Sequence, residues 1–245
     1  MRLEGKTALV TGAARRVGRV IAQALARRGA AIAIHYNRSR KDARALADRI
    51  RRTSGVETAL FKADLSSPAQ VRTLARSALR RFGTVHVLVN NAAIWERTPF
   101  GRVTPADWDA HLDINLRAPF LLAQALGPAM RKAGYGKIVN IADWAGQRPY
   151  PDYIPYCVSK GALLALNAAL AKALAPEVQV NAVLPGPVLP PEGAGAGFRK
   201  AAARATLVRR LGSPEDIARA ALFLIEGTDF ATGAALPVDG GRSLA

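Results

Sequence analysis

Short apolar segments alternate with helix-patterned segments along the whole chain, and this alternation constrains the fold more than any other feature. Strands separated by helices of this length pair in parallel, because a parallel connection needs a crossover. The chain therefore predicts one Rossmann-like α/β domain over residues 1–245, a doubly wound parallel sheet of about seven strands with helices on both faces. The predicted strands are Lys6–Val10, Ala30–Tyr36, Glu57–Lys62, Val85–Val89, Lys137–Ile141, Val178–Val183 and a closing one in Ala235–Gly241.

Composition narrows the class of protein. The chain has 245 residues, 50% of them hydrophobic, which suffices for one sizeable core. The single cysteine, Cys157, excludes an intrachain disulfide, the N-terminal residues lack a secretory pattern, and no uncharged apolar run approaches the roughly 18 residues of a membrane span. A soluble cytoplasmic protein with no membrane partner is expected.

The formal charge of +17 raises the question of nucleic-acid binding. The basic residues are distributed over nearly every predicted helix, without aromatic interleaving and without a concentrated tail. This distribution favours a solvated basic surface that attracts phosphorylated or carboxylated small molecules, with no nucleic-acid partner.

The first predicted strand is followed by TGAARRVG and then by a helix that ends near Gly29. Strand, glycine-bearing turn and helix form the opening of a dinucleotide-binding unit, in which the free N–H groups of the helix N-terminus face a pyrophosphate. Gly12 suits the tight turn and Gly18 allows close helix packing. The loop residues predicted to contact the cofactor are Gly12, Arg15, Arg16, Val17 and Gly18.

The end of the second strand predicts the type of cofactor. An NAD-binding protein usually has an acidic residue there for the ribose 2′-hydroxyl, whereas this chain has His35, Asn37, Arg38 and Ser39. A cation with hydrogen-bonding neighbours suits a 2′-phosphate, so NADPH is the expected cofactor. Alternatively, Ser39 caps a helix flanked by surface arginines, and both interpretations can hold together.

Other candidate cofactor contacts follow the later strands. Asp64 and Leu65 come after the third strand, where adenine would lie, and Asn91 and Ala92 after the fourth. Trp95 is either a flat platform for a planar substrate or a core side chain.

Two further segments have open interpretations. Asn115 lies in Pro105–Met130, which is predicted as one long helix or two joined near Ala118 and Pro119; a mid-helix asparagine is disfavoured unless its amide has a partner. The Pro- and Gly-rich segment Pro185–Gly197 is predicted as a mobile lid over the site, with a passive linker as the alternative.

Three ionisable residues are the candidate catalytic group. Tyr156 and Lys160 are four positions apart, so they share one helix face, and Asp143 follows the fifth strand thirteen residues before Tyr156. Asp143 could instead cap the turn that follows it. The three histidines lack metal-ligand spacing, so no metal site is predicted.

The ordered motifs resemble the short-chain dehydrogenase/reductase family over the entire chain. They are TGAARRVG, Asp64, NNAA at Asn90–Ala93, Asn115, the pair Tyr156 and Lys160, and PGPV at Pro185–Val188. The resemblance implies that Tyr156 donates a proton, that Lys160 lowers its pKa and holds the nicotinamide ribose, and that Asn115 supports a relay water. It also implies cofactor contacts at Pro185, Gly186 and Val188, and a homotetramer packed through its long helices.

Two departures from the family pattern concern the substrate. Arg16 occupies the usual middle glycine of the loop, and Asp143 the usual catalytic serine; both match the pteridine reductase branch, as does HYNRS at His35–Ser39. In that branch an aromatic residue at the position of Trp95 stacks on the pterin, and Arg16, Asp143 and Tyr156 contact the substrate.

The predicted function is therefore NADPH-dependent reduction of a dihydropterin or dihydrofolate. The alternatives are a reductase of another carbonyl compound, such as a 3-oxoacyl thioester, and a non-catalytic NADP(H)- or nucleic-acid-binding protein.

Overall fold

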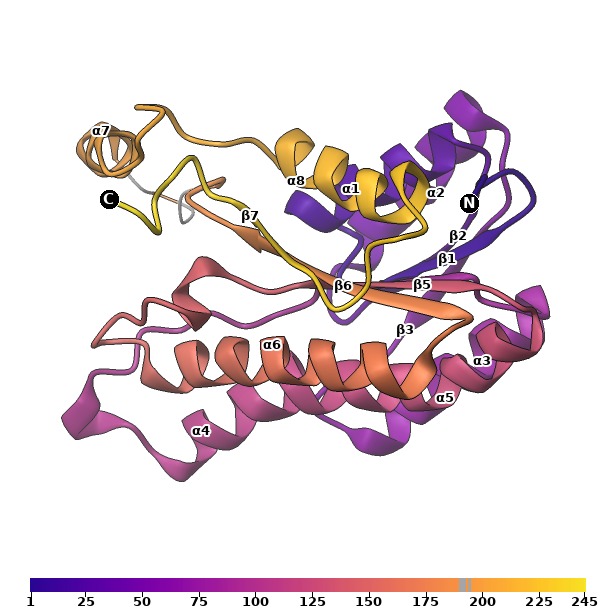
Figure 1. Ribbon diagram of the computed structural model, residues 1–245, viewed down its shortest axis with the longest axis horizontal. Coiled ribbons are helices and arrows are strands. Elements are labelled where there is room, and N and C mark those ends of the chain that lie inside the picture. The colour runs from indigo at the N-terminus through magenta and orange to yellow at the C-terminus, as the bar shows by residue number, and fades with distance from the viewer. Residues whose placement is uncertain (190–192, 194) are drawn as a thin grey trace.

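The computed structural model describes residues 1–189, 193 and 195–245. Its centre is a seven-stranded sheet with the order β3-β2-β1-β4-β5-β6-β7, and all of its pairings are parallel. This confirms the predicted single doubly wound α/β domain (Figure 1). The strands are β1 Thr7–Val10, β2 Ala31–Tyr36, β3 Thr58–Lys62, β4 Val87–Asn90, β5 Gly136–Ile141, β6 Val178–Pro185 and β7 Ala235–Val238.

Helices cover both faces of the sheet and make two cores (Figure 1). Alternate residues of a strand point to opposite faces, so Val10 belongs to one core and Leu9 to the other. One face carries α1 Arg16–Arg27, α2 Arg40–Ser54 and α8 Pro214–Leu222, and the other carries α3 Pro68–Phe82, α4 Pro105–Leu112, α5 Ala118–Lys132 and α6 Ile154–Leu174. Strands β1, β4 and β5 are buried throughout, and the side chains in them are mostly apolar.

Local capping explains where two of these helices begin. Ser67 caps α3 by accepting from the Gln70 backbone N–H, and Ser213 forms a reciprocal capping box with Asp216 at the start of α8. Both caps are followed by proline in the first turn, where its missing N–H costs no hydrogen bond.

Two segments differ from or refine the sequence prediction. The segment predicted as one or two helices is α4 and α5 joined without a break by the π-helical turn η2 Asp113–Arg117, which contains Asn115. A helix missed by the sequence, α7, begins at Ala196, within the last two residues of the predicted lid, and ends at Arg204. The predicted lid Pro185–Gly197 lies partly outside the described residues.

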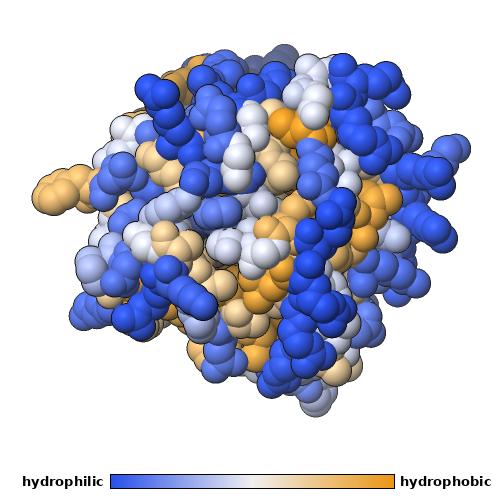
Figure 2. Space-filling view, turned by 90° about the vertical axis from the view of Figure 1, so that its right-hand side faces the viewer, coloured by the Kyte–Doolittle hydropathy of each residue, from blue (hydrophilic) through white to orange (hydrophobic). Residues whose placement is uncertain are grey.

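Hydrophilic side chains are distributed over the surface, as the spread of basic residues along the sequence predicted. Figure 2 shows the face on the right of Figure 1 covered mostly by hydrophilic side chains, with smaller apolar areas between them. One helix, α6, is long and apolar enough by composition to cross a membrane. Its buried residues include Leu170, which belongs to the core on its face of the sheet, and Leu163, which packs in a smaller separate cluster with Ala142, Ala182 and Leu184. Packing within the protein therefore accounts for its apolar composition.

Candidate active site

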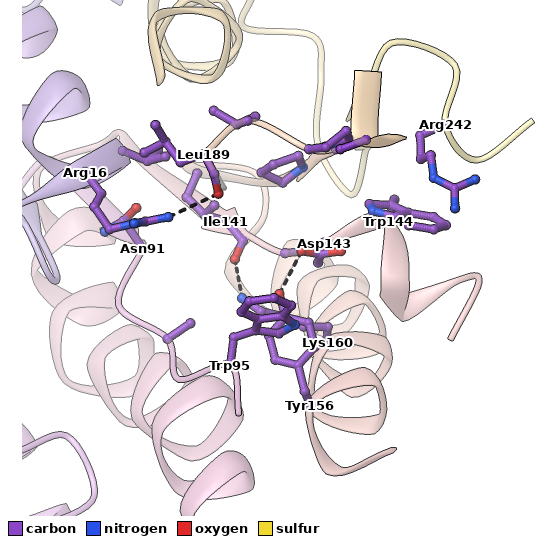
Figure 3. A pocket seen from close by; sticks show the side chains of 18 of the residues that line it. Arg16, Asn91, Trp95, Ile141, Asp143, Trp144, Tyr156, Lys160, Leu189 and Arg242 are labelled. Atoms are coloured by element: carbon purple, nitrogen blue, oxygen red, sulfur yellow. Dashed lines mark hydrogen bonds between the residues drawn. The ribbon is translucent and has the colours of Figure 1, made fainter. Parts of the chain in front are cut away.

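A cavity of about 750 Å³ opens at the carboxyl ends of the central strands (Figure 3). It is lined by the loop after β1, the ends of β4, β5 and β6, the start of α6, part of α7 and the segment after β7. The carboxyl edge of a doubly wound sheet is where such folds bind ligands. The predicted site residues that line the cavity are Gly12, Arg15, Arg16, Val17, Gly18, Asn91, Ala92, Trp95, Asp143, Tyr156, Lys160, Pro185, Gly186 and Val188.

The glycine loop is packed so closely that side chains do not fit. Gly12 has a φ of +62°, and a Cβ at Gly18 would lie 2.5 Å from both the Asn91 Nδ2 and the Gly12 carbonyl oxygen. Asn91 ties the loop to β4, because its Nδ2 donates to the Thr11 carbonyl oxygen at 2.8 Å. The backbone is therefore left bare toward the cavity, as close approach of a phosphate requires.

Arg16 and Arg15 bring positive charge to this loop. Arg16 has a φ of +52°, the left-handed region that normally selects glycine and costs other residues about 1 kcal/mol. Its guanidinium donates to the Leu189 carbonyl oxygen at 3.2 Å across the cavity, and Arg15 Nε donates to Asp42 at 2.7 Å. The left-handed backbone of Arg16 therefore directs an arginine side chain across the cavity at a position that normally favours glycine.

His35 requires a correction, because its ring does not face a ligand. It is 2% exposed; its Nδ1 accepts from the Gly12 N–H at 3.1 Å, and its Nε2 donates to the Ala63 carbonyl oxygen at 3.1 Å. Both ring nitrogens are used within the protein, and burial lowers the pKa of His35 to about 4. His35 therefore supports the glycine loop from beneath as a neutral ring.

The predicted 2′-phosphate residues Asn37, Arg38 and Ser39 lie outside the cavity lining, between β2 and α2. Asn37 and Arg38 are exposed, and the Ser39 side chain makes no capping hydrogen bond at the start of α2. The alternative role of Ser39 as a cap is thus not observed. Asp64 is held by Ser66, whose N–H and Oγ both donate to Asp64 Oδ1, and Leu65 is buried.

Tyr156 and Asp143 form the centre of the cavity. The Tyr156 hydroxyl donates to Asp143 Oδ2 at 2.7 Å, while Asp143 Oδ1 accepts from the Ala145 N–H at 2.8 Å (Figure 3). Asp143 therefore both meets the tyrosine and caps the following turn, and its catalytic role stays a prediction. Burial raises the pKa of Asp143, opposed by these hydrogen bonds and by the Lys160 charge.

The pKa of Tyr156 is raised well above its ordinary value, first by burial and then by the Asp143 charge. The resemblance implied that Lys160 lowers the pKa of Tyr156, but in the protein without cofactor the pKa of Tyr156 is raised. Lys160 is 3% exposed, its Nζ donates to the Ile141 carbonyl oxygen at 2.7 Å, and it lies 5.8 Å from the Tyr156 ring centroid. Burial lowers the pKa of Lys160 to about 8. The Tyr156 hydroxyl therefore keeps its proton at neutral pH.

Asn115 is buried one layer behind the cavity and does not line it. Its Oδ1 accepts from the Ile94 N–H at 3.0 Å, and its Nδ2 donates to the Ile94 carbonyl oxygen at 3.1 Å and to Ser159 Oγ at 3.0 Å. The amide thus has the partners that a mid-helix asparagine needs. It joins the segment before Trp95 to α6 next to Lys160, so it positions both.

Trp95 stands at the cavity edge, 45% exposed. One face of its indole stacks on Tyr153 at 4.9 Å between ring centroids and 4° between planes. The sequence left Trp95 open between a substrate platform and a core side chain. Its exposure excludes the core alternative, and its role as a platform stays a prediction.

The cavity residues that the sequence analysis missed include Trp144, Tyr150 and Arg242. Trp144 and Tyr150 form an edge-to-face pair at 5.1 Å, and the Arg242 guanidinium lies 4.7 Å from the Trp144 ring centroid. Their position could have been inferred, because Trp144 and Arg242 each follow a strand that ends at the active edge.

The residues fit a dinucleotide, since the loop at Gly12 and Gly18 is a cradle that any Cβ would fill. Gly186, which also lines the cavity, allows close packing of the end of β6 against the segment after β7, because its Cβ would lie 2.5 Å from the Asp239 Cα. Gly12, Gly18, Asn91 and Ala92 would hold the phosphates, and Lys160 the ribose beside the reacting ring. Within the described residues no group of three His, Cys, Asp or Glu side chains could hold a metal ion.

Comparison with known proteins places the chain in a family. A family model described as enoyl-(acyl carrier protein) reductase matches residues 12–243. Granaticin polyketide synthase putative ketoacyl reductase 2 of Streptomyces violaceoruber is 35% identical, with 98% of this chain and 97% of that protein covered. D-threitol dehydrogenase of Mycolicibacterium smegmatis is 36% identical, with 99% and 95% covered.

A solved structure is equally similar. The crystal structure of a blue fluorescent protein from a metagenomic library in complex with NADPH has a TM-score of 0.92, 35% identity and 99% coverage of both chains. With the glycine cradle, the Tyr156 and Lys160 pair and the sheet order, these matches show that the chain belongs to the short-chain dehydrogenase/reductase family, whose members use NAD(P)H.

Proposed function

We propose that this chain is an NADPH-dependent reductase of a dihydropterin or dihydrofolate. The main observation in favour of this substrate class is the hydrogen bond from Tyr156 to Asp143 at the centre of the cavity. NADPH as cofactor is supported by the glycine cradle, by the cation Arg38 where NAD-binding proteins usually have an acid, and by the similar protein whose structure holds NADPH.

Asp143 favours a substrate rich in hydrogen-bond donors. An ionised carboxylate only accepts hydrogen bonds, and it repels the negative oxygen that forms when a ketone is reduced. The amino group and ring N–H of a pterin are donors that this carboxylate can accept. The exposed indole face of Trp95, backed by Tyr153, supplies a surface for stacking a flat ring.

In the proposed reaction a ring C=N bond becomes C–N with a new N–H, and NADPH becomes NADP⁺. The bound nicotinamide would supply the hydride to the ring carbon. Tyr156, whose raised pKa keeps its hydroxyl proton in place, passes that proton toward the adjacent ring nitrogen, and Asp143 orients the hydroxyl. Lys160, held by the Ile141 carbonyl oxygen, keeps a positive charge beside the two.

The second candidate is a reductase of a carbonyl compound, such as a 3-oxoacyl thioester or a sugar. The named relatives, a ketoacyl reductase and a polyol dehydrogenase, favour this candidate over the first. One feature of the site is compatible with it: burial raises the pKa of Asp143, and a protonated carboxyl could donate to a carbonyl oxygen as serine does.

A substrate panel with Asp143 variants tests the proposal. NADPH oxidation is followed with dihydrobiopterin, dihydrofolate and an acetoacetyl thioester. The wild type is expected to reduce the pterins, and both Asp143→Ser and Asp143→Asn to lose about 100-fold or more in kcat/KM for them. Asp109→Asn, an exposed acid on α4, is the control and keeps full activity. Turnover of the thioester alone, or faster thioester reduction by Asp143→Ser, would replace the first candidate with the second.

We also propose that the chain acts in the cytoplasm as a homotetramer packed through its long helices. The apolar side chains Trp108, Phe120 and Val158, on α4, α5 and α6, are 38%, 40% and 41% exposed in the single chain. Burial of these side chains between copies would stabilise such an assembly. Sedimentation analysis of the wild type and of Phe120→Glu tests it; a wild-type monomer would refute it.

A further inference from the structure

Arg242 lies at the end of the cavity opposite Arg16 (Figure 3). Asp143 and Tyr156 are between the two arginines, and the Arg242 guanidinium is 4.7 Å from the Trp144 ring centroid. A planar guanidinium over an indole is fixed in direction while its N–H groups remain available at the edge.

The turn that carries Arg242 is tightly built. Asp239 is 7% exposed, and its carboxylate accepts from the Gly241 N–H at 2.9 Å and from the Ser243 N–H at 2.8 Å. The backbone N–H of Arg242 donates to the Asp239 carbonyl oxygen at 3.2 Å. Gly240 and Gly241 take left-handed φ values of +64° and +77°. This turn therefore holds the Arg242 backbone in one place.

A second arginine anchors the segment from the other side. Arg148 donates to the carbonyl oxygens of Ser243 at 2.5 Å and Ala245 at 3.0 Å. Arg148 is thus occupied by backbone, whereas the Arg242 side chain forms no ion pair with any residue of the described chain. A positioned, unneutralised guanidinium on a cavity wall suits an anionic group of a ligand.

The cofactor does not supply that anion. Its phosphates belong at the glycine loop and the N-terminus of α1, beside Arg15 and Arg16, and Lys160 lies between that loop and Arg242 (Figure 3). Arg242 lies beyond Asp143 and Tyr156, at the end of the cavity away from the glycine loop, so a substrate tail that points away from the cofactor would reach it (Figure 3).

Building on the proposed function, we propose that Arg242 binds a carboxylate on the tail of the substrate and makes the site prefer dihydrofolate over dihydrobiopterin. The glutamate of dihydrofolate carries carboxylates, which match the guanidinium fork in a bidentate manner, whereas the dihydrobiopterin side chain is neutral. Arg242 thus determines specificity and takes no part in the proton transfer.

The test compares kcat/KM of both pterins for the wild type, Arg242→Gln, Arg242→Lys and the control Arg44→Gln, an exposed arginine on α2. The wild type favours dihydrofolate. Arg242→Gln lowers the ratio of kcat/KM for dihydrofolate over dihydrobiopterin by about 10- to 100-fold, mainly through KM for dihydrofolate. Arg242→Lys restores part of that ratio, because it keeps the charge but loses the fork, and Arg44→Gln leaves the ratio unchanged.

A binding measurement separates recognition from turnover. Calorimetry with NADP⁺ present, where no reduction occurs, is expected to show weaker dihydrofolate binding to Arg242→Gln than to the wild type. Equal losses for both pterins, or an unchanged ratio, would overturn the role of Arg242 while the proposed reduction stands. If the wild type reduces neither pterin, the proposed function itself fails, and this inference with it.

Discussion

Replacing Lys160 by methionine is expected to stabilise the protein while abolishing activity. In the fold Lys160 is buried, and burial lowers its pKa from 10.5 to about 8. At 1.36 kcal/mol per pKa unit, this difference means that the charged lysine costs the folded state about 3 kcal/mol at neutral pH. Methionine removes that cost and fills a similar volume.

The gain is reduced by the contact that Lys160 makes. Its Nζ donates to the Ile141 carbonyl oxygen at 2.7 Å, and loss of this hydrogen bond costs about 1 kcal/mol. The net effect is an increase of about 2 kcal/mol in the free energy of unfolding, or roughly 5 °C in Tm for a chain of this size. Such a gain would mean that lysine is kept at this position for function at the expense of stability.

The sign of the pH dependence follows from the lowered pKa. Between pH 8 and 10.5 the unfolded chain holds the lysine proton and the folded chain does not, so the wild type gains stability relative to the variant as pH rises. The advantage of Lys160→Met is therefore full below pH 8 and is lost above pH 10.5.

Urea unfolding of the wild type and Lys160→Met at pH 7 and near pH 10.5 measures this difference. Lys172→Met, an exposed lysine on the same helix, is the matched control and changes stability by less than about 0.5 kcal/mol. A Lys160→Met variant less stable than the wild type at pH 7, or a difference equal at both pH values, would refute the argument that burial of this charge is costly.

Two further substitutions probe the cofactor side. Gly18→Ala places a Cβ 2.5 Å from the Gly12 carbonyl oxygen, so it is expected to destabilise the fold by about 1–3 kcal/mol and to weaken NADPH binding. The control Gly101→Ala, whose Cβ would have no atom within 4 Å, is expected to have neither effect. Thermal unfolding measures the stability, and titration with NADPH measures the binding. Arg38→Gln is expected to lower the preference for NADPH over NADH about tenfold in steady-state kinetics, with Arg44→Gln as the control, and an unchanged preference would remove Arg38 from the 2′-phosphate site.

Local pattern was enough for most of the fold. The strand segments, the glycine turn and the proline-marked helix starts at Ser67 and Ser213 each depend on neighbours in the sequence, and all are present. The helix α7 was missed because its glycine- and alanine-rich surroundings give no clear apolar period, and none of its residues is buried.

Side-chain environments could not be obtained in the same way. The sequence placed His35 at the cofactor because it lies at the end of the second strand, close to Arg38. Alternation along β2 instead turns its ring inward, where it bonds to Gly12 and Ala63. The direction of the Tyr156 pKa shift was likewise missed, since it depends on burial, which no spacing reveals.

The sequence by itself determined the doubly wound sheet, the glycine cradle and the meeting of Asp143, Tyr156 and Lys160, because short spacings and strand ends fix these. Only the tertiary structure decided that Trp95 is backed by Tyr153 and that Arg242, almost a hundred residues after Asp143, closes the far end of the cavity. The physical reason is that packing between distant segments sets which side chains are buried, paired or left open to a ligand.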